Sequence, residues 1–88
     1  MEKITYNFKN RTAVVTGGAQ GFGLDIAKRF LKSEAKVIIW DLDPKAIENA
    51  INEIDNPNLS SKIVDVSNFK DVESASKEII KTSNIILI

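Results

Sequence analysis

Residues 16–23, TGGAQGFG, contain all four glycines of this 88-residue chain. Glycine inside regular structure costs roughly 0.5–1 kcal/mol relative to alanine, so this concentration needs a physical reason. A short β-branched run, TAVVT at residues 12–16, ends where the glycines begin and is typical of a buried strand. A helical pattern begins as the glycines end. The glycines therefore occupy a predicted strand-to-helix turn.

The segments that follow the glycines alternate between helix and strand. Residues 22–32 show helical spacing, and one apolar stripe is predicted to face the core. This stripe comprises Phe22, Ile26, Ala27, Phe30 and Leu31. Residues 36–40, KVIIW, are mostly apolar on successive positions, which is typical of a strand buried on both faces of a parallel sheet. Asp43 and Pro44 then form a helix start, with Asp43 as N-cap and the proline at the first helical position.

The same alternation continues to residue 88. The second helix is predicted to run to Asp55, and a third strand is predicted over residues 61–66, SKIVDV. Ser67 or Asn68 is expected to cap a third helix, and residues 85–88, IILI, form a fourth apolar run. The residues predicted to face inward are Ile47, Ala50, Ile51 and Ile54 in the second helix, and Val72, Ala75, Ile79 and Ile80 in the third.

The order of these elements is β-α-β-α-β-α-β, with connections of a few residues. This order predicts a parallel sheet with right-handed crossovers, in an α/β fold of the Rossmann-like, doubly wound type. A complete sheet of that type has about six strands. We therefore expect residues 1–88 to form a single, partial domain that is the N-terminal portion of such a fold.

The composition excludes several classes of function. Twelve basic and twelve acidic residues cancel, which argues against nucleic acid or an anionic membrane as a partner. The chain has no cysteine and no histidine, so the usual metal ligands, thiol nucleophile and general base are missing. No run approaches the roughly 20 apolar residues of a membrane span, and the first ten residues are too polar for a signal peptide. We expect a cytoplasmic protein.

The glycine turn is a candidate phosphate site, because a helix N-terminus presents unpaired N–H groups and the positive end of the helix dipole. Gly17 is expected to make the tight turn, Gly21 to let pyrophosphate approach the backbone, and Gly23 to let the helix pack on the strand. Gly18 is expected only to relax the loop. The spacing differs from Gly-x-Gly-x-x-Gly and from a P-loop. The alternative is a turn that merely joins strand to helix.

Asp41 strengthens the case for a dinucleotide. It follows the second predicted strand, 18 positions after Gly23, where an acceptor for a ribose 2′-hydroxyl is expected. Its charge would repel a 2′-phosphate, and neither Gln20 nor Leu42 is basic. The sequence therefore favours NAD over NADP. The alternatives for Asp41 are a solvated loop acid or a helix cap, although Asp43 fits the cap better.

These motifs together resemble the short-chain dehydrogenases/reductases, over residues 9–88. The matching segments are KNRTAVVTGGAQGFGLDIAKRF at residues 9–30 and VDVSNFKDVESA at residues 64–75. The resemblance implies that Asp65 accepts a hydrogen bond from the adenine amino group and that the Val66 backbone meets the ring. The alternative for Asp65 is a role in capping the third helix. The expected cofactor-binding residues are Thr16, Gly17, Gln20, Gly21, Phe22, Gly23, Asp41, Leu42, Asp65 and Val66.

The resemblance implies the NAD-binding portion of an oxidoreductase that transfers a hydride between nicotinamide and an alcohol/carbonyl substrate. The groups that look nearest are 3-oxoacyl-carrier-protein reductases and sugar or polyol dehydrogenases, and a homo-oligomeric parent is expected. The family's catalytic Ser and Tyr-x-x-x-Lys have no counterpart here. Tyr6 is the only tyrosine and is followed four positions later by Asn10. We therefore expect a truncated chain that is inactive alone.

Two other interpretations stay open at this stage. The first is a non-catalytic nucleotide-binding module, or a degraded remnant, that needs a partner. Exposed aliphatic side chains and an open strand edge at residues 85–88 would then predict association. The second is an α/β domain without any ligand.

Overall fold

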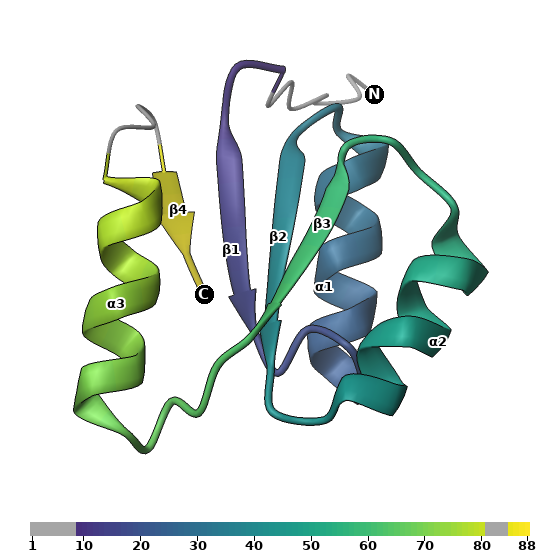
Figure 1. The fold of residues 1–88 in the computed structure, drawn as a ribbon. Helices are drawn as coiled ribbons and strands as arrows, with labels where there is room; N and C mark the ends of the chain where they lie inside the picture. Colours follow the sequence, from purple (N-terminus) through teal and green to yellow (C-terminus); the bar gives the residue numbers. More distant parts are fainter. Residues whose placement is uncertain (1–8, 81–84) are drawn as a thin grey trace.

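The structure, a computed structural model, describes residues 9–80 and 85–88. Tyr6 lies outside the described residues. Four strands and three helices alternate along the described chain, in the predicted order (Figure 1). The strands are β1 (Thr12–Thr16), β2 (Lys36–Asp41), β3 (Leu59–Ile63) and β4 (Ile85–Leu87), and the helices are α1 (Gly21–Lys32), α2 (Pro44–Ile54) and α3 (Phe69–Ile79).

The strands form one parallel sheet in the order β3-β2-β1-β4. In the centre of the sheet, Val14 of β1 is in register with Ile38 of β2 and with Leu87 of β4. Ile88 extends the pairing beyond β4, because its N–H donates to the Val14 carbonyl at 2.9 Å. The predicted fold class, a Rossmann-like parallel α/β sheet, is confirmed.

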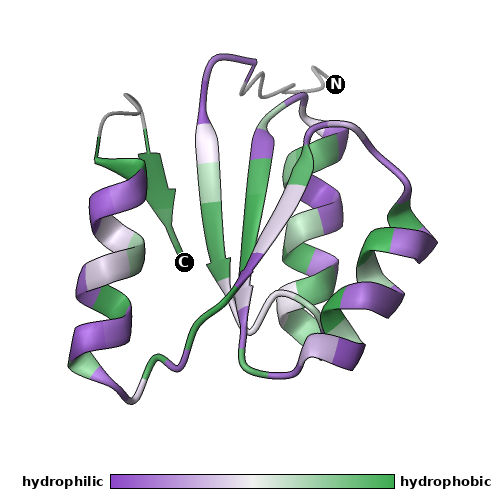
Figure 2. Ribbon diagram, viewed as in Figure 1, coloured by the Kyte–Doolittle hydropathy of each residue, from purple (hydrophilic) through white to green (hydrophobic). Residues whose placement is uncertain are grey.

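The helices cover the two faces of the sheet unequally, as Figures 1 and 2 show. Side chains alternate between the faces along each strand, so each strand supplies both cores. One core joins the sheet to α1 and α2 through Ala13, Val15, Val37, Ile39, Ala27, Leu31, Ile47 and Ala50. The other core joins the sheet to α3 through Val14, Trp40, Val64 and Ala75. Burial on both faces explains the continuous apolar runs of β1 and β2.

The two edge strands of the described sheet differ in chemistry. On β3, Ser60 and Ser61 are exposed and Lys62 is half-buried. Lys62 also reaches across to α3, where its Nζ lies 2.5 Å from the Glu78 carboxylate. On β4, in contrast, every residue is aliphatic, and Leu87 is 65% exposed.

The starts of α2 and α3 are fixed by side-chain caps. Asp43 Oδ1 accepts hydrogen bonds from the N–H groups of Lys45 and Ala46 at 3.0 and 3.2 Å, as predicted for an N-cap followed by Pro44. Asn68 Oδ1 accepts from the Asp71 N–H at 3.2 Å. Asn68, and not the preceding serine, is therefore the cap of α3.

Three predictions about the elements are wrong. The third strand was expected over residues 61–66 but spans Leu59–Ile63, because its register with β2 ends at the pair of Asp41 and Ile63, followed only by a hydrogen bond from the Val64 N–H to the Asp41 carbonyl at 3.1 Å. Phe22 is 89% exposed: it lies in the first turn of α1, beyond the part of the helix that covers the sheet. Ile80 is 77% exposed because α3 ends at Ile79 and Ile80 is only its C-cap.

Candidate functional site

A cavity of about 220 Å³ opens at the carboxyl ends of β1, β2 and β3. Ligands of open α/β sheets bind at this end of the strands. The residues that line it are Gly17, Trp40, Asp41, Leu42, Val64, Asp65, Val66 and Ser67. Five of the ten predicted cofactor-binding residues thus meet in one cavity, although they come from three separate segments of the chain. These segments are the turn after β1, the end of β2 with the residue after it, and the loop after β3.

The backbone of the glycine turn is bent by two residues in the left-handed region. Gly17 has φ +64° and Gly21 has φ +54°, values that side-chain-bearing residues rarely adopt. The Gly17 N–H donates to the Trp40 carbonyl at 2.7 Å, which ties the turn to the end of β2. A Cβ at Gly21 would meet no atom within 4 Å, so the space next to this residue is open. This open space is consistent with the predicted approach of a phosphate.

The other two glycines are needed for close packing. A Cβ at Gly23 would lie 2.1 Å from the Gly17 carbonyl oxygen, so this glycine lets the start of α1 approach the turn after β1. Farther along α1, Ala27 and Leu31 pack on the strand itself. A Cβ at Gly18 would lie 2.9 Å from the Val15 carbonyl oxygen and 3.0 Å from a side-chain carbon of Ile39. Gly18 therefore does more than relax the loop, because it lets the turn lie against the core.

The N-terminus of α1 carries no side-chain cap. Gln20 occupies the N-cap position, but its side chain accepts no hydrogen bond from the first turn, and that turn contains no acidic residue. The N–H groups of Gly21, Phe22 and Gly23 precede the first residue with an intrahelical acceptor, Leu24, which donates to the Gln20 carbonyl. A helix start with free N–H groups and an uncompensated dipole favours an anionic ligand. In α2 and α3, by contrast, side chains fill this role.

Asp41 ends β2 beside the glycine turn and is only 8% exposed. Its Oδ2 accepts a hydrogen bond from the Ala19 N–H at 3.1 Å, and its Oδ1 accepts from the Asp43 N–H at 3.1 Å. The alternative of a solvated loop acid is therefore wrong. The helix-cap alternative is also wrong, because the Asp43 side chain caps α2. A carboxylate oxygen can accept two hydrogen bonds, so these contacts leave capacity for ribose hydroxyls.

Asp65 and Val66 follow β3 on the opposite side of the cavity. Asp65 Oδ1 accepts from the Ser67 N–H at 2.9 Å and from the Ser67 hydroxyl at 2.6 Å. These hydrogen bonds, the hydroxyl first, stabilise the ionised carboxylate and hold the pKa of Asp65 below its usual value. Asn68 is the N-cap of α3, and the hydrogen bonds that the Asp65 carboxylate accepts come from Ser67, before the helix. Asp65 supports the start of α3 through its N–H, which donates to Asp71 Oδ2 in the first turn at 3.1 Å.

Two exposed apolar side chains flank these acids. Leu42 is 62% exposed and Val66 is 58% exposed, and both line the cavity. Contiguous exposed apolar surface is a common feature of ligand-binding grooves. They offer an apolar wall of the kind that the flat face of a nucleobase would cover.

The remaining predicted site residues lie around the turn. The Thr16 hydroxyl donates to the Ile88 carbonyl at 2.9 Å, and the Thr16 N–H donates to the same oxygen at 2.9 Å. Thr16 thereby joins β1 to β4, a role that the sequence did not reveal. Gln20 lines a different depression, between α1 and α2, and Phe22 projects into solvent.

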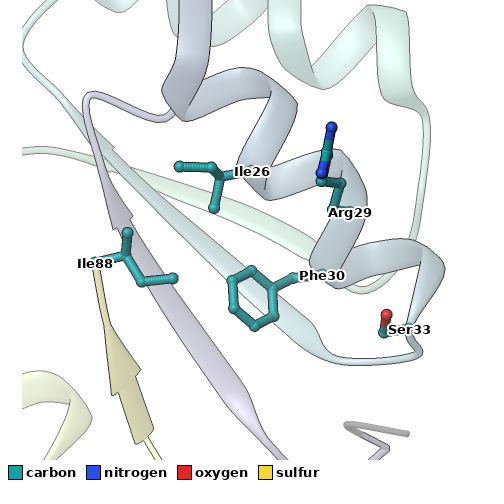
Figure 3. A pocket seen from close by; sticks show the side chains of 5 residues that line it. All are labelled: Ile26, Arg29, Phe30, Ser33 and Ile88. Carbon is teal, nitrogen blue, oxygen red and sulfur yellow. The ribbon is translucent and has the colours of Figure 1, made fainter. Parts of the chain in front are cut away.

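A larger, apolar cavity of about 400 Å³ lies between α1 and the end of β4 (Figure 3). It is lined by Ile26, Arg29, Phe30, Ser33 and Ile88. None of the predicted cofactor-binding residues reaches it, and its lining offers one cation and one hydroxyl. The candidate site is therefore the smaller cavity at the glycine turn.

The described residues give no support to a metal site or a membrane span. No group of three or more aspartate, glutamate, histidine or cysteine side chains gathers in the described part of the chain. Likewise, no helix within residues 9–80 and 85–88 has the length and apolar character to cross a membrane.

The parallel sheet and the uncapped, glycine-rich start of α1 define a Rossmann-type α/β protein. The family model of the short chain dehydrogenases matches residues 11–86. The chain belongs to this family, which confirms the resemblance seen in the sequence.

Curated relatives cover part of the chain at moderate identity. An uncharacterized oxidoreductase of Mycobacterium bovis is 39% identical over 64 residues, which are 72% of this chain and 26% of the relative. A 2-dehydro-3-deoxy-L-rhamnonate dehydrogenase (NAD(+)) of Sphingomonas sp. is 35% identical over 71 residues, 81% of this chain and 28% of the relative. A 3-oxoacyl-(acyl-carrier-protein) reductase of Chlamydia trachomatis is 41% identical over 61 residues, 66% of this chain and 25% of the relative. The chain thus spans about a quarter of these relatives.

Solved structures share this fold over nine-tenths or more of the chain. A short-chain dehydrogenase/reductase, glucose/ribitol dehydrogenase, from Brucella melitensis superposes with a TM-score of 0.82 at 28% identity, over 96% of this chain and 37% of that structure. A short chain dehydrogenase from Bacillus anthracis gives a TM-score of 0.79 at 30% identity, over 91% of this chain and 35% of that structure.

Proposed function

We propose that this chain forms the NAD-binding part of an oxidoreductase that transfers a hydride between a nicotinamide cofactor and an alcohol/carbonyl substrate. The observation that carries the proposal is the meeting of Gly17, Asp41 and Asp65 in one cavity beside the uncapped start of α1. The relatives support the class of reaction, because the three described above carry the names of oxidoreductases, and one of those names includes NAD(+).

The pyrophosphate, the adenosine ribose and the adenine of a dinucleotide each have a matching group in the site. The N–H groups at the start of α1 suit the pyrophosphate, and the open space beside Gly21 lets it approach. The carboxylate of Asp41 suits the ribose hydroxyls and repels a 2′-phosphate, so NAD is preferred to NADP. Leu42 and Val66 suit the adenine ring, and Asp65 Oδ2, which accepts no hydrogen bond from the described residues, suits its amino group.

The nicotinamide would supply the hydride chemistry once the cofactor is bound. The residues of this chain bind and orient the adenosine and pyrophosphate. We therefore assign cofactor binding, and not the proton transfer that accompanies hydride transfer, to the residues of this site.

The test is a titration of the chain with NAD and with NADP. Trp40 is the chain's only tryptophan and lines the cavity while being 2% exposed, so its fluorescence should report binding. We expect NAD to bind more tightly than NADP. Asp41→Ala should weaken the binding of NAD, because the acceptor for the ribose hydroxyls is lost. It should also reduce the difference in affinity between NAD and NADP, because the charge that repels the 2′-phosphate is lost.

A matched control removes the same charge from a distant surface. Glu48 lies exposed on α2, and its carboxylate is 3.8 Å from Lys45 Nζ, so Glu48→Ala should cost little stability. We expect Glu48→Ala to leave both affinities unchanged. No binding of either dinucleotide by the wild-type chain would refute the proposal, and equal NAD affinity in Asp41→Ala would refute the ribose assignment.

A further inference from the structure

The carboxylate of Asp41 connects two backbone segments that are far apart in sequence. One oxygen accepts from the N–H of Ala19, 22 positions earlier, in the middle of the glycine turn. The other accepts from the N–H of Asp43, at the start of α2. The side chain therefore links the turn after β1 to the loop after β2, next to the Gly17 hydrogen bond to Trp40.

The contact with Ala19 is buried. Ala19 is 5% exposed and Asp41 is 8% exposed, so water has little access to the N–H or to the oxygen that it meets. Within the described chain, Asp41 is the acceptor that the structure gives to the Ala19 N–H. A buried N–H that loses its partner is costly, and a hydrogen bond to a charged acceptor is stronger than one between neutral groups. Gly18, directly before Ala19, and Gly21, two positions after it, restrict the backbone less than other residues would.

We propose that Asp41 is a positioning residue, whose carboxylate holds the glycine turn in its binding shape through the Ala19 N–H. This is distinct from its contact with ribose. It gives one side chain two functions: it selects the ribose, and it orders the loop that receives the pyrophosphate. The affinity for any dinucleotide should therefore depend on Asp41, even when the dinucleotide lacks the hydroxyls of the adenosine ribose.

This inference rests on the proposed function, because the shape of the turn affects binding only if the turn holds the pyrophosphate. Two experimental arms separate the two ideas. The first arm uses no cofactor and measures the exchange rate of the Ala19 amide hydrogen by NMR. The second arm measures the affinity of the chain for NAD and for an NAD analogue that lacks both hydroxyls of the adenosine ribose.

The variants are Asp41→Ala, Asp41→Asn and the matched control Asp43→Ala. Asp43→Ala removes the cap of α2 but leaves the Ala19 contact, so it controls for a general loss of stability. Asp41→Asn keeps the shape of the side chain and one acceptor oxygen. If Asp41→Ala fails to fold, Asp41→Asn therefore still tests whether the Asp41 carboxylate orders the glycine turn.

We expect Asp41→Ala to accelerate exchange of the Ala19 amide about tenfold or more and to weaken the analogue by about tenfold, in line with loss of a charge-assisted hydrogen bond. For Asp41→Asn, both the exchange rate of the Ala19 amide and the affinity for the analogue should lie between the values for wild type and Asp41→Ala. Asp43→Ala should leave the affinity for the analogue unchanged. Equal affinity of the analogue for wild type and both Asp41 variants would overturn the inference. The inference would also be overturned if the Asp41 variants changed the exchange rate of the Ala19 amide no more than Asp43→Ala does. Failure of the wild-type chain to bind NAD would overturn the proposed function, while the first arm would still decide whether Asp41 orders the turn.

Discussion

Replacement of Gly23 by alanine should test how tightly α1 packs on the turn after β1. The added Cβ would lie 2.1 Å from the Gly17 carbonyl oxygen and 2.7 Å from its carbonyl carbon, whereas real Cβ contacts essentially never fall below 3.0 Å. The turn and the helix must therefore separate by about 1 Å. Overpacking costs about 1–3 kcal/mol, and the upper end applies because both contacted atoms are backbone.

Alanine also gains up to about 1 kcal/mol of helix propensity over glycine, so we expect a net loss of about 2 kcal/mol. For a domain of this size that loss corresponds to a fall in Tm of about 8–16 °C, measured by thermal unfolding followed by circular dichroism. Gly21→Ala is the matched control: no atom lies within 4 Å of the added Cβ, and only the left-handed backbone is strained, at a cost of about 1 kcal/mol. A Tm for Gly23→Ala at or above that of the wild type would refute the reasoning.

Two further predictions concern the hydrogen bonds around the site. Ser67→Ala should raise the pKa of Asp65 in an NMR titration, because the hydroxyl that stabilises the carboxylate is lost; an unchanged midpoint would contradict this. The pKa of Asp65 is lower in the folded protein than in the unfolded protein. The ionised carboxylate therefore stabilises the folded state at pH values above the unfolded pKa of Asp65, and this contribution is lost as the pH falls through the folded pKa. Thr16→Val should remove the hydroxyl donor to the Ile88 carbonyl, cost about 0.5–1.5 kcal/mol in urea unfolding and accelerate exchange of the Ile88 amide. If the Ile88 amide exchanges at the same rate in Thr16→Val as in the wild type, the Thr16 hydroxyl does not hold β4.

The alternation of elements could be predicted because β1, β2 and β4 are apolar runs and each helix has one apolar stripe. The errors occurred where an element ends. Phe22 and Ile80 have the correct spacing for the core, but spacing does not show where a helix runs past the sheet that it covers. The third strand was placed too late because Val64, which is buried against α3, lies just beyond the last residue pair of β2 and β3 and is joined to β2 by the hydrogen bond from its N–H to the Asp41 carbonyl.

In the candidate site, sequence position indicated which residues converge but not what their atoms contact. The order of Gly17, Asp41 and Asp65 after three parallel strands predicted their meeting, because the strands end at one edge of the sheet. The contact of Asp41 with Ala19 could not be predicted, since it depends on the path of the turn between two left-handed glycines. The same holds for Thr16 and Ile88, which meet only because β1 pairs with β4.

The unlike edges of the sheet give it a direction of growth. Along β3, serines and a lysine that is paired with α3 present polar groups, which is how natural sheets discourage the addition of another strand. Along β4, the side chains are aliphatic, and Leu87 leaves an apolar surface beside backbone groups that are able to pair. A further strand of this sheet, whether from the same polypeptide or from another molecule, should therefore pair with β4 and not with β3. The helices that cover the widened sheet should then be added on the β4 side alone.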